Sequence, residues 1–149
     1  MTKVSIIMTC YNGEKYLRQA IKSIIAQTFK KWELIFFDNN STDNSKKILY
    51  EFKDKRIFYF KNNFTLKLGA ARNLAFKKCK GDLITFLDVD DLWNKNKLML
   101  QFKKFQTNQN IQILYTKYYI LKNNELIKGN FAKFVKGKCK NEIIFSYIE

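Results

Sequence analysis

Apolar and polar positions along most of the chain follow two alternating patterns. Short, nearly unbroken apolar runs are typical of strands buried on both faces of a parallel sheet, and they occupy residues 4–9, 33–37, 56–60 and 83–87. Between these runs, apolar residues recur every three or four positions, which is the period of an amphipathic helix. Those positions include Leu17, Ile21 and Ile24, then Ile48, Leu49 and Phe52, then Ala71, Leu74 and Ala75. The alternation predicts an α/β fold with a mostly parallel sheet, right-handed crossovers and helices on both faces.

Single residues predict where the helices begin and end. Asn, Ser, Thr and Asp are the preferred N-cap residues, so we expect Asn12 to cap the first helix. The second helix is expected to be capped by Ser41, Thr42 or Asp43. The third helix should begin near residue 68, and Gly81 is expected to follow it as a terminator in the left-handed conformation.

The remainder of the chain has weaker periodicity. Leu98, Phe102 and Phe105 predict a fourth helix, and residues 111–119 predict a fifth strand. Asn123 and Asn124 are turn-forming residues, so Leu126–Ile127 is expected to begin the return strand of a hairpin. A last helix is expected near residues 141–147.

Carboxylates follow the strand at residues 83–87. Asp88, Asp90 and Asp91 lie at its carboxyl end, and ligands of open α/β sheets bind at that edge. Three neighbouring acids repel one another unless a cation or hydrogen-bond donors offset their charge. Mg²⁺ and Mn²⁺ prefer such oxygen ligands and are usually shared with substrate phosphates. The simpler alternative is a strand end followed by an Asp that caps a helix.

Two more polar clusters should meet these carboxylates, because the ends of parallel strands share one edge. They are Thr9-Cys10-Tyr11 and Asp38-Asn39-Asn40. Tyr11 could stack on a base, and Asn39 could hydrogen-bond to a base edge. The alternatives are that Tyr11 is a core aromatic and that Asn39 and Asn40 are only turn formers. No dinucleotide fingerprint or P-loop is present.

Composition limits the classes of protein and partner. The chain has 149 residues, 46% of them hydrophobic, which suits one globular domain with a core. Its 28 basic and 13 acidic residues give a formal net charge of +15. This charge could steer nucleotides, touch an anionic membrane or attract nucleic acid. We interpret most of the lysines as a compositional habit of the source, and we expect no specific nucleic-acid partner, since Arg is rare.

Cysteine and histidine usage narrows the chemistry further. Three separated cysteines with no CxxC pair favour a reduced, cytoplasmic protein. The absence of histidine excludes Ser-His and Cys-His catalysis and histidine-based metal sites. The sequence shows no signal peptide and no apolar run of transmembrane length.

Five motifs in a fixed order resemble family 2 glycosyltransferases, which have the GT-A (Rossmann-like) nucleotide-sugar fold. The resemblance covers residues 3–120. The motifs are the strand and Tyr-Asn turn at residues 4–12, Ser23-Ile24-Ile25-Ala26-Gln27-Thr28, Asp38-Asn39-Asn40-Ser41-Thr42-Asp43, Gly69-Ala70-Ala71-Arg72-Asn73, and the DxD Asp88-Val89-Asp90 with Asp91 and Trp93. A DxD alone is weak evidence, whereas five ordered motifs are highly specific.

The resemblance implies a role for each matching residue. Thr9 and Tyr11 would bound the base pocket, and Asn39 would face the base's Watson–Crick edge. Arg72 would lie near base and phosphates, Asp88 would touch the ribose or the metal, and Asp90 would ligate Mn²⁺ or Mg²⁺. The implied reaction is inverting transfer from a nucleotide-diphosphate sugar, UDP-sugar first, to a saccharide or lipid-linked glycan in polysaccharide biosynthesis. A carboxylate base would take the acceptor's proton. The implied location is cytoplasmic, at the inner face of a membrane.

The sequence departs from the family at two points. The family often has Asp where Asn39 stands, which leaves the donor open. The acidic motif that carries the family's catalytic base has no counterpart here, so the base is unknown and Asp91 is only a weak candidate. We therefore expect residues 1–120 to be the nucleotide-sugar-binding half, and residues 121–149 an incomplete acceptor half or a tail of a truncated or shortened relative.

Two other functions fit parts of the sequence. Phe86-Leu87-Asp88-Val89-Asp90 also resembles the strand and DxD of haloacid dehalogenase-type phosphohydrolases, although Asp91-Leu92 follows where that family has Gly-Thr. A basic nucleic-acid binder is the other alternative, and its affinity would fall steeply with salt.

Overall fold

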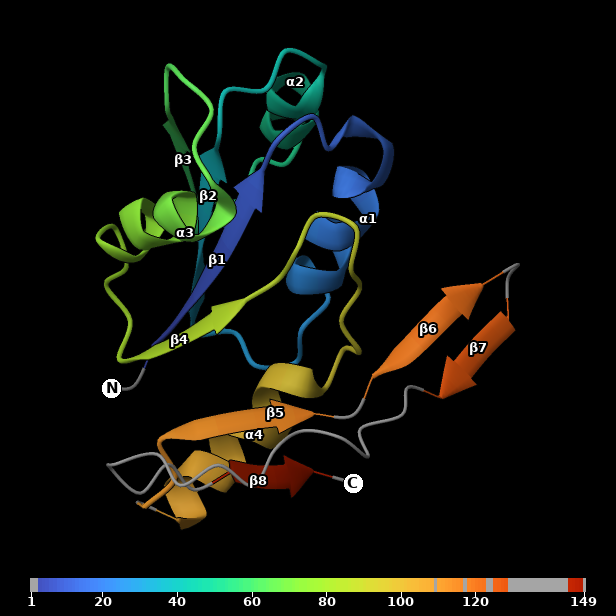
Figure 1. Ribbon diagram of the computed structural model, residues 1–149. Helices are drawn as coiled ribbons and strands as arrows, with labels where there is room; N and C mark the ends of the chain where they lie inside the picture. The colour runs from blue at the N-terminus through green and yellow to red at the C-terminus, as the bar shows by residue number, and fades with distance from the viewer. Residues whose placement is uncertain (1–2, 109, 117, 123–124, 129–144, 149) are drawn as a thin grey trace. The chain divides into compact units, whose positions relative to one another are not determined.

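The structure is a computed structural model of the 149-residue chain. It describes residues 3–108, 110–116, 118–122, 125–128 and 145–148. The chain forms two compact units, Met1–Lys95 and Asn96–Glu149 (Figure 1), which are described separately.

The first unit is built on a four-stranded parallel sheet with the strand order β3-β2-β1-β4. The strands are β1 (Val4–Cys10), β2 (Trp32–Asp38), β3 (Ile57–Lys61) and β4 (Leu83–Phe86). All four coincide closely with the apolar runs of the sequence. The two central strands are the most buried, as the apolar pattern predicts for strands covered on both faces.

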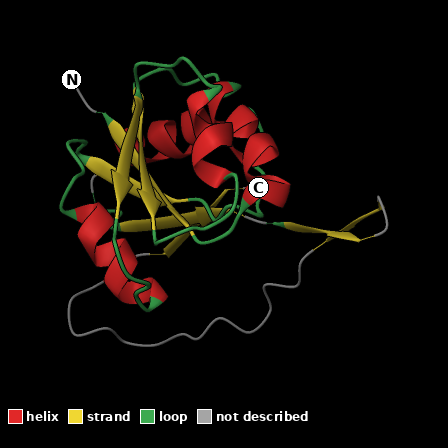
Figure 2. Cartoon of the chain, turned by 90° about the horizontal axis from the view of Figure 1, so that it is seen from above, coloured by secondary structure: helices red, strands yellow, loops and turns green. Residues whose placement is uncertain are grey.

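Helices cover both faces of this sheet, which confirms the predicted α/β class. The helices are α1 (Glu14–Ile25), α2 (Ser45–Tyr50) and α3 (Leu68–Phe76). Helix α3 packs on β1 and β2 from one side, and α1 and α2 lie on the other side (Figures 1 and 2). The α3 face encloses a core of Ile7, Ile35, Phe37, Ala71 and Ala75. Because two alanines form its contact surface, α3 can approach the sheet closely.

The helix boundaries differ from the expected caps. Gly13, and not Asn12, is the N-cap of α1, and Asn44 is the N-cap of α2. Asn12 instead adopts a left-handed backbone with φ of 51°, a conformation in which Asn is enriched. Asp43 lies one residue too early to be the cap, although its carboxylate accepts the Ser45 N–H at 2.9 Å. Phe52 lies beyond the end of α2.

Gly81 is not the left-handed terminator that we expected, since no glycine in the described part of the chain has a positive φ. Its role is close approach. A Cβ at Gly81 would lie 2.6 Å from the Ser5 nitrogen and 2.7 Å from the Lys3 carbonyl oxygen. The α3–β4 connection therefore passes directly against β1, and only glycine fits there without displacing backbone.

A buried carboxylate fastens the same connection. Glu33 on β2 is almost fully buried and accepts hydrogen bonds from Ser5 Oγ at 2.6 Å and from the Lys80 N–H at 2.7 Å. Its other oxygen pairs with Lys3 Nζ at 2.6 Å. Burial alone would raise the pKa of Glu33, but these donors together hold the pKa below its ordinary value.

The second unit contains one helix and two strand pairs among its described residues. These elements are α4 (Lys97–Thr107), β5 (Ile113–Thr116), β6 (Tyr119–Lys122), β7 (Glu125–Lys128) and β8 (Phe145–Ile148). Strands β6 and β7 pair antiparallel, which confirms the return strand at Leu126–Ile127. The Asn123-Asn124 turn itself lies outside the described residues.

Two predictions for this unit are wrong. The single strand expected over residues 111–119 is interrupted, with β5 pairing in parallel with β8 and β6 belonging to the hairpin. The helix expected near residues 141–147 is contradicted by β8 at its carboxyl end, and residues 141–144 lie outside the described residues. In both cases pairing with a distant strand overrides a weak local pattern.

Candidate functional site

The carboxyl ends of β1, β2 and β3 and the segment after β4 lie side by side, as the alternating pattern predicts. Backbone hydrogen bonds join the segments that leave this edge. The Asn39 N–H donates to the Cys10 carbonyl at 2.7 Å, and the Asn62 N–H donates to the Asp38 carbonyl at 2.9 Å. The Leu87 N–H continues the β4 ladder by donating to the Ile7 carbonyl at 3.0 Å. The edge is therefore a continuous platform from which four polar loops emerge.

Tyr11 follows β1 and is 55% exposed. The alternative that it is a core aromatic is therefore wrong, and its ring is accessible to a ligand. Thr9, two residues earlier, is paired in register with Phe37 and is half-buried at the end of β1. These two residues place a hydroxyl and an aromatic ring at the carboxyl end of the same strand.

Asn39 is buried and makes a reciprocal pair with the backbone of Leu66. Its Nδ2 donates to the Leu66 carbonyl at 2.9 Å, and its Oδ1 accepts the Leu66 N–H at 3.0 Å. An amide side chain can make four hydrogen bonds, so this pair uses half of that capacity. Asn39 thus fixes the β3–α3 loop before any base contact is considered, a role that the sequence did not reveal.

Asn40 is a turn former, as the simpler alternative proposed. Its backbone is left-handed with φ of 71°, and its side chain reaches Thr65 Oγ1 at 3.4 Å, which is a weak contact. The two adjacent asparagines therefore have different roles, although the sequence presents them as equivalents.

Side chains of the β1–α1 and β2–α2 loops hold the starts of the two helices together. Asn12 Oδ1 accepts the Thr42 N–H at 2.8 Å, and the Asn12 N–H donates to Ser41 Oγ at 3.1 Å. Glu14 and Asp43 exchange further bonds, since the Glu14 N–H donates to Asp43 and the Asn44 N–H donates to Glu14. Ser41, Thr42 and Asp43 of the third motif therefore have a structural role, since they hold the two helix starts together.

Asp38 is a buried structural carboxylate. It accepts the Tyr59 hydroxyl at 2.8 Å and the Ser41 N–H at 2.7 Å. Burial, followed by the Asp38 carboxylate, raises the pKa of Tyr59, so the phenol stays protonated as a donor. Cys10, the neighbour of Asp38 across β1 and β2, is also buried, and burial raises the pKa of its thiol. Neither the Tyr59 hydroxyl nor the Cys10 thiol is therefore readily deprotonated for catalysis.

The structure brings together two residues that the sequence placed in the site from different elements. Arg72 on α3 donates to Asp88 Oδ1 at 2.6 Å, and its guanidinium lies 5.5 Å from the Phe86 ring centroid. The Arg72 and Asp88 side chains are 32% and 46% exposed. Exposed pairs of this kind contribute about 0–1 kcal/mol, so an anionic ligand could compete for Arg72 at little cost.

The three carboxylates after β4 lie in one tight turn, which is closed by the Asp91 N–H donating to the Asp88 carbonyl at 3.1 Å. Burial raises the pKa of Asp91, and the charges of Asp90 and Asp88 raise it further. This repulsion indicates an acidic turn that a cation would stabilise. Among the described residues, no group of three His, Cys, Asp or Glu side chains forms a metal cage. The donor set suits a cation shared with phosphate.

The segment after the carboxylates is tied to the end of α1. The Trp93 N–H donates to Ser23 Oγ at 3.2 Å, and Gln27 Nε2 donates to the Asn94 carbonyl at 2.8 Å. The Thr28 N–H donates to the Lys95 carbonyl at 2.9 Å. Gln27 is fully buried and has a structural role at the end of the helix, so this attachment explains the second family motif.

Comparisons with known proteins agree with this geometry. Residues 5–146 match the family described as Glycosyl transferase family 2. The chain is 40% identical over 129 residues to the UDP-Glc:alpha-D-GlcNAc-diphosphoundecaprenol beta-1,3-glucosyltransferase WfgD of Escherichia coli, and 38% identical over 132 residues to WfaP, a protein of the same description. These alignments cover 87% and 89% of this chain, but only 50% and 52% of the relatives. The chain thus spans about half the length of the curated relatives it matches.

Solved structures show the same fold. TarS of S. aureus, residues 1–349, in complex with UDP-GlcNAc superposes with a TM-score of 0.75 at 26% identity, over 91% of this chain and 37% of that chain. A mannosyltransferase from Pyrobaculum calidifontis in complex with GDP-Man and Mn²⁺ matches with a TM-score of 0.72 at 18% identity, over 78% of this chain and 36% of that chain. No helix in the described residues is long and apolar enough to cross a membrane.

Proposed function

The chain belongs to glycosyl transferase family 2, and on this basis we propose that it binds a UDP-sugar at the carboxyl edge of its four-stranded sheet. The full protein would transfer that sugar to an acceptor hydroxyl. The observation that carries the proposal is the pairing of Arg72 with Asp88 beside the acidic turn at this edge. UDP is favoured because WfgD is named for UDP-Glc and the TarS structure is a complex with UDP-GlcNAc.

The nucleotide would be held by groups from four elements. The exposed Tyr11 ring would stack on uracil, which is worth about 1–3 kcal/mol for a base on an aromatic side chain. Thr9 would bound the base pocket. Asn39 retains one N–H and one lone pair beyond its bonds to Leu66, and these would meet the polar edge of uracil. Arg72 would turn from Asp88 toward the diphosphate.

A divalent cation, Mn²⁺ or Mg²⁺, fits the acidic turn because three carboxylates lie there at mutual electrostatic cost. Asp90 would be its main protein ligand and Asp88 would assist. When bound, such a cation neutralises the negative charge that develops on a diphosphate leaving group. Asp88, released by Arg72, would then contact the cation or the ribose.

Transfer would invert the configuration at the anomeric carbon, and a base would take the proton of the attacking hydroxyl. Asp91 is a weak candidate for this base at the acidic turn, where Asp90 and Asp88 would hold the cation. Its pKa is raised by burial and by Asp90 and Asp88, but a cation at the turn would cancel that effect. A positioned base contributes about 10²–10⁴ in rate. We therefore propose that the 149-residue chain binds the donor but transfers sugar weakly or only hydrolyses it slowly.

The acceptor would be a saccharide or a lipid-linked glycan. WfgD and WfaP are named for an acceptor carried on diphosphoundecaprenol. A similar acceptor would place this protein in the cytoplasm at the inner face of a membrane. The phosphohydrolase alternative is not retained, because the glycosyltransferase match extends over residues 5–146 and not only over the strand and DxD.

Calorimetry with UDP-glucose, UDP-GlcNAc and GDP-mannose, each with and without Mn²⁺, tests the proposal. We expect a UDP-sugar to bind best and only with the cation. Asp90→Asn should abolish the cation-dependent part of the affinity and leave the fold intact. Glu51→Gln is the control, because it removes one carboxylate charge from an exposed ion pair with Arg18. Unchanged UDP affinity in Asp90→Asn, or tighter binding of GDP-mannose, would refute the assignment.

Competence is tested separately by a turnover assay on the 149-residue chain with mixed saccharide acceptors. Transfer at about 1 s⁻¹ or faster, a rate usual for enzymes, would show that the base lies within these residues. Asp91→Asn would then be the first variant to examine, with UDP-sugar affinity measured alongside to separate binding from chemistry.

A further inference from the structure

One stretch of the first unit carries positive charge without any acidic neighbour in sequence. Between the end of β3 and the start of β4, residues 61–80 contain no Asp or Glu. The basic residues of this stretch, called here the basic segment, are Lys61, Lys67, Arg72, Lys77, Lys78 and Lys80. All five of its lysines are exposed. Residues 15–32 are equally free of Asp and Glu, so charge alone does not distinguish the basic segment from the rest of the first unit.

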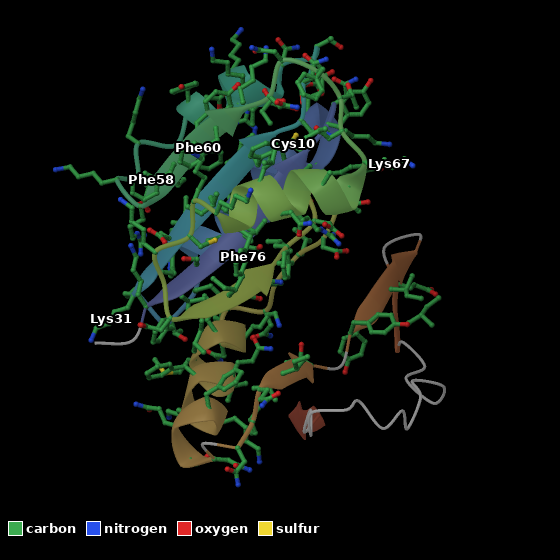
Figure 3. All side chains as sticks on the ribbon, turned by 60° about the vertical axis from the view of Figure 1, so that its left-hand side comes forward. Cys10, Lys31, Phe58, Phe60, Lys67 and Phe76 are labelled. Carbon is green, nitrogen blue, oxygen red and sulfur yellow. The ribbon has the colours of Figure 1, made fainter. Side chains whose placement is uncertain are left out.

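Large apolar side chains are exposed on the same segment. Phe64 is 62% exposed, Leu68 is 53% exposed and Phe76 is 55% exposed. Single exposed apolar residues are ordinary, but these three lie within thirteen residues of one another among lysines. Figure 3 shows α3 lying across the sheet, with Lys67 near one end of the helix and Phe76 near the other.

The cause lies in how α3 packs. The helix meets the sheet through Ala71 and Ala75, which are fully buried. Of its larger apolar residues, Leu74 packs against the core, whereas Leu68 and Phe76 remain on the solvent side. Such an arrangement destabilises an isolated soluble domain slightly, because apolar surface stays in water. It becomes favourable when that surface meets an apolar medium bordered by negative charge.

We propose that the basic segment, residues 61–80, is the surface by which this protein rests on an anionic phospholipid bilayer. Lysines are attracted to anionic headgroups, and exposed Phe and Leu insert at the boundary between headgroups and acyl chains. Charge complementarity selects this partner. Nucleic acid would use the lysines but would gain nothing from the exposed Leu68.

The basic segment lies next to the donor site, which relates the bilayer contact to the proposed function. Arg72 belongs to α3 and reaches the acidic turn of the donor site, so a bilayer under α3 would lie close to the site where an acceptor must arrive. This purpose rests on the proposed function with a lipid-linked acceptor. The bilayer contact itself rests only on the exposure and charge of the segment, and it can be tested without any sugar.

The test is sedimentation of the 149-residue chain with vesicles of phosphatidylcholine alone and with vesicles containing one third phosphatidylglycerol. We expect binding to the anionic vesicles that weakens with salt. The charge variant replaces three exposed lysines of the segment, and its control removes the same charge elsewhere in the first unit. The variants are Lys67→Gln/Lys77→Gln/Lys78→Gln and, as control, Lys22→Gln/Lys30→Gln/Lys31→Gln.

The charge variant should lose about tenfold or more in partitioning to anionic vesicles, since each lysine near such a surface is worth roughly fivefold. The control should change much less. Phe64→Ser/Phe76→Ser should also weaken binding, while UDP-sugar affinity stays unchanged in all three variants. Equal losses in charge variant and control, no preference for anionic vesicles, or displacement by a short RNA with no effect of the Phe variant would overturn the proposal.

UDP-sugar affinity in the same proteins separates the two claims. Normal vesicle binding without UDP-sugar binding would refute the proposed donor site and leave the bilayer contact standing. The reverse result would refute only the bilayer contact.

Discussion

Asn39→Asp is the substitution that best tests how this site is organised. The family pattern that the sequence resembles has Asp at this position, so the change looks harmless from the sequence. In the structure, Asn39 Nδ2 donates to the Leu66 carbonyl at 2.9 Å and Oδ1 accepts the Leu66 N–H at 3.0 Å. An aspartate can keep the second bond but must place an oxygen against the Leu66 carbonyl. The β3–α3 loop should therefore loosen.

The magnitude follows from the groups involved. Loss of one buried hydrogen bond, with a carbonyl left unsatisfied, costs about 1–3 kcal/mol. Asn39 is only 6% exposed, so water cannot readily replace the lost partner. For a chain of this size, each kcal/mol lowers Tm by about 2–4 °C. Since the loop borders the donor site, UDP-sugar affinity should fall together with stability.

Asn40→Asp is the matched control. It introduces the same charge one residue away, at a left-handed backbone position that Asp also tolerates, and its only side-chain contact in the described residues is a weak one of 3.4 Å to Thr65. Denaturant unfolding and calorimetry with UDP-sugar should be measured for both variants. Equal stability of the two would refute the reasoning. Unchanged stability with altered base preference would show that Asn39 reads the base and does not position the loop.

Three further predictions concern other parts of the first unit. Tyr11→Ala should weaken UDP-sugar binding by about 1–3 kcal/mol without lowering Tm, and a loss of Tm instead would show a core role. Gly81→Ala should destabilise the fold by about 1–3 kcal/mol, since its Cβ would meet β1 backbone at 2.6 Å. Gly69→Ala, with no atom within 4 Å of the added Cβ, should be neutral or stabilising, and similar unfolding energies for the two would contradict the packing argument. Burial alone would raise the pKa of Glu33, but Lys3, Ser5 and the Lys80 N–H lower the folded-state pKa below its ordinary value. The contribution of Glu33 to the free energy of unfolding is therefore complete above the unfolded-state pKa and is lost as pH falls through the folded-state pKa. The free energy of unfolding, measured between about pH 3 and 7, should show this loss near the ordinary Glu pKa of about 4.3 and below. Glu33→Gln should be less stable by about 1–3 kcal/mol at neutral pH, and its stability should depend less on acid.

The sequence by itself determined which segments form strands and helices in the first unit, the class of fold, and the edge of the sheet where the candidate site lies. Apolar runs such as those of β1 and β2 can be satisfied only by burial on both faces, which requires covering helices and a parallel sheet. Parallel strands then bring Tyr11, Asn39 and Asp88 to one edge whatever the details of packing. These features depend on local periodicity and on topology, and both can be read from residue order.

Only the tertiary structure decided what individual polar residues do there. The sequence could not distinguish Asn39 from Asn40, because their roles depend on whether the Leu66 backbone arrives beside one of them. It could not reveal that Gly81 serves close approach and not a left-handed turn, because the neighbouring backbone belongs to residues far away in sequence. For the same reason, the sequence could not show that Phe76 is exposed. Hydrogen bonds and close contacts between distant segments are specific to a three-dimensional arrangement, and hydrophobic patterning does not encode them.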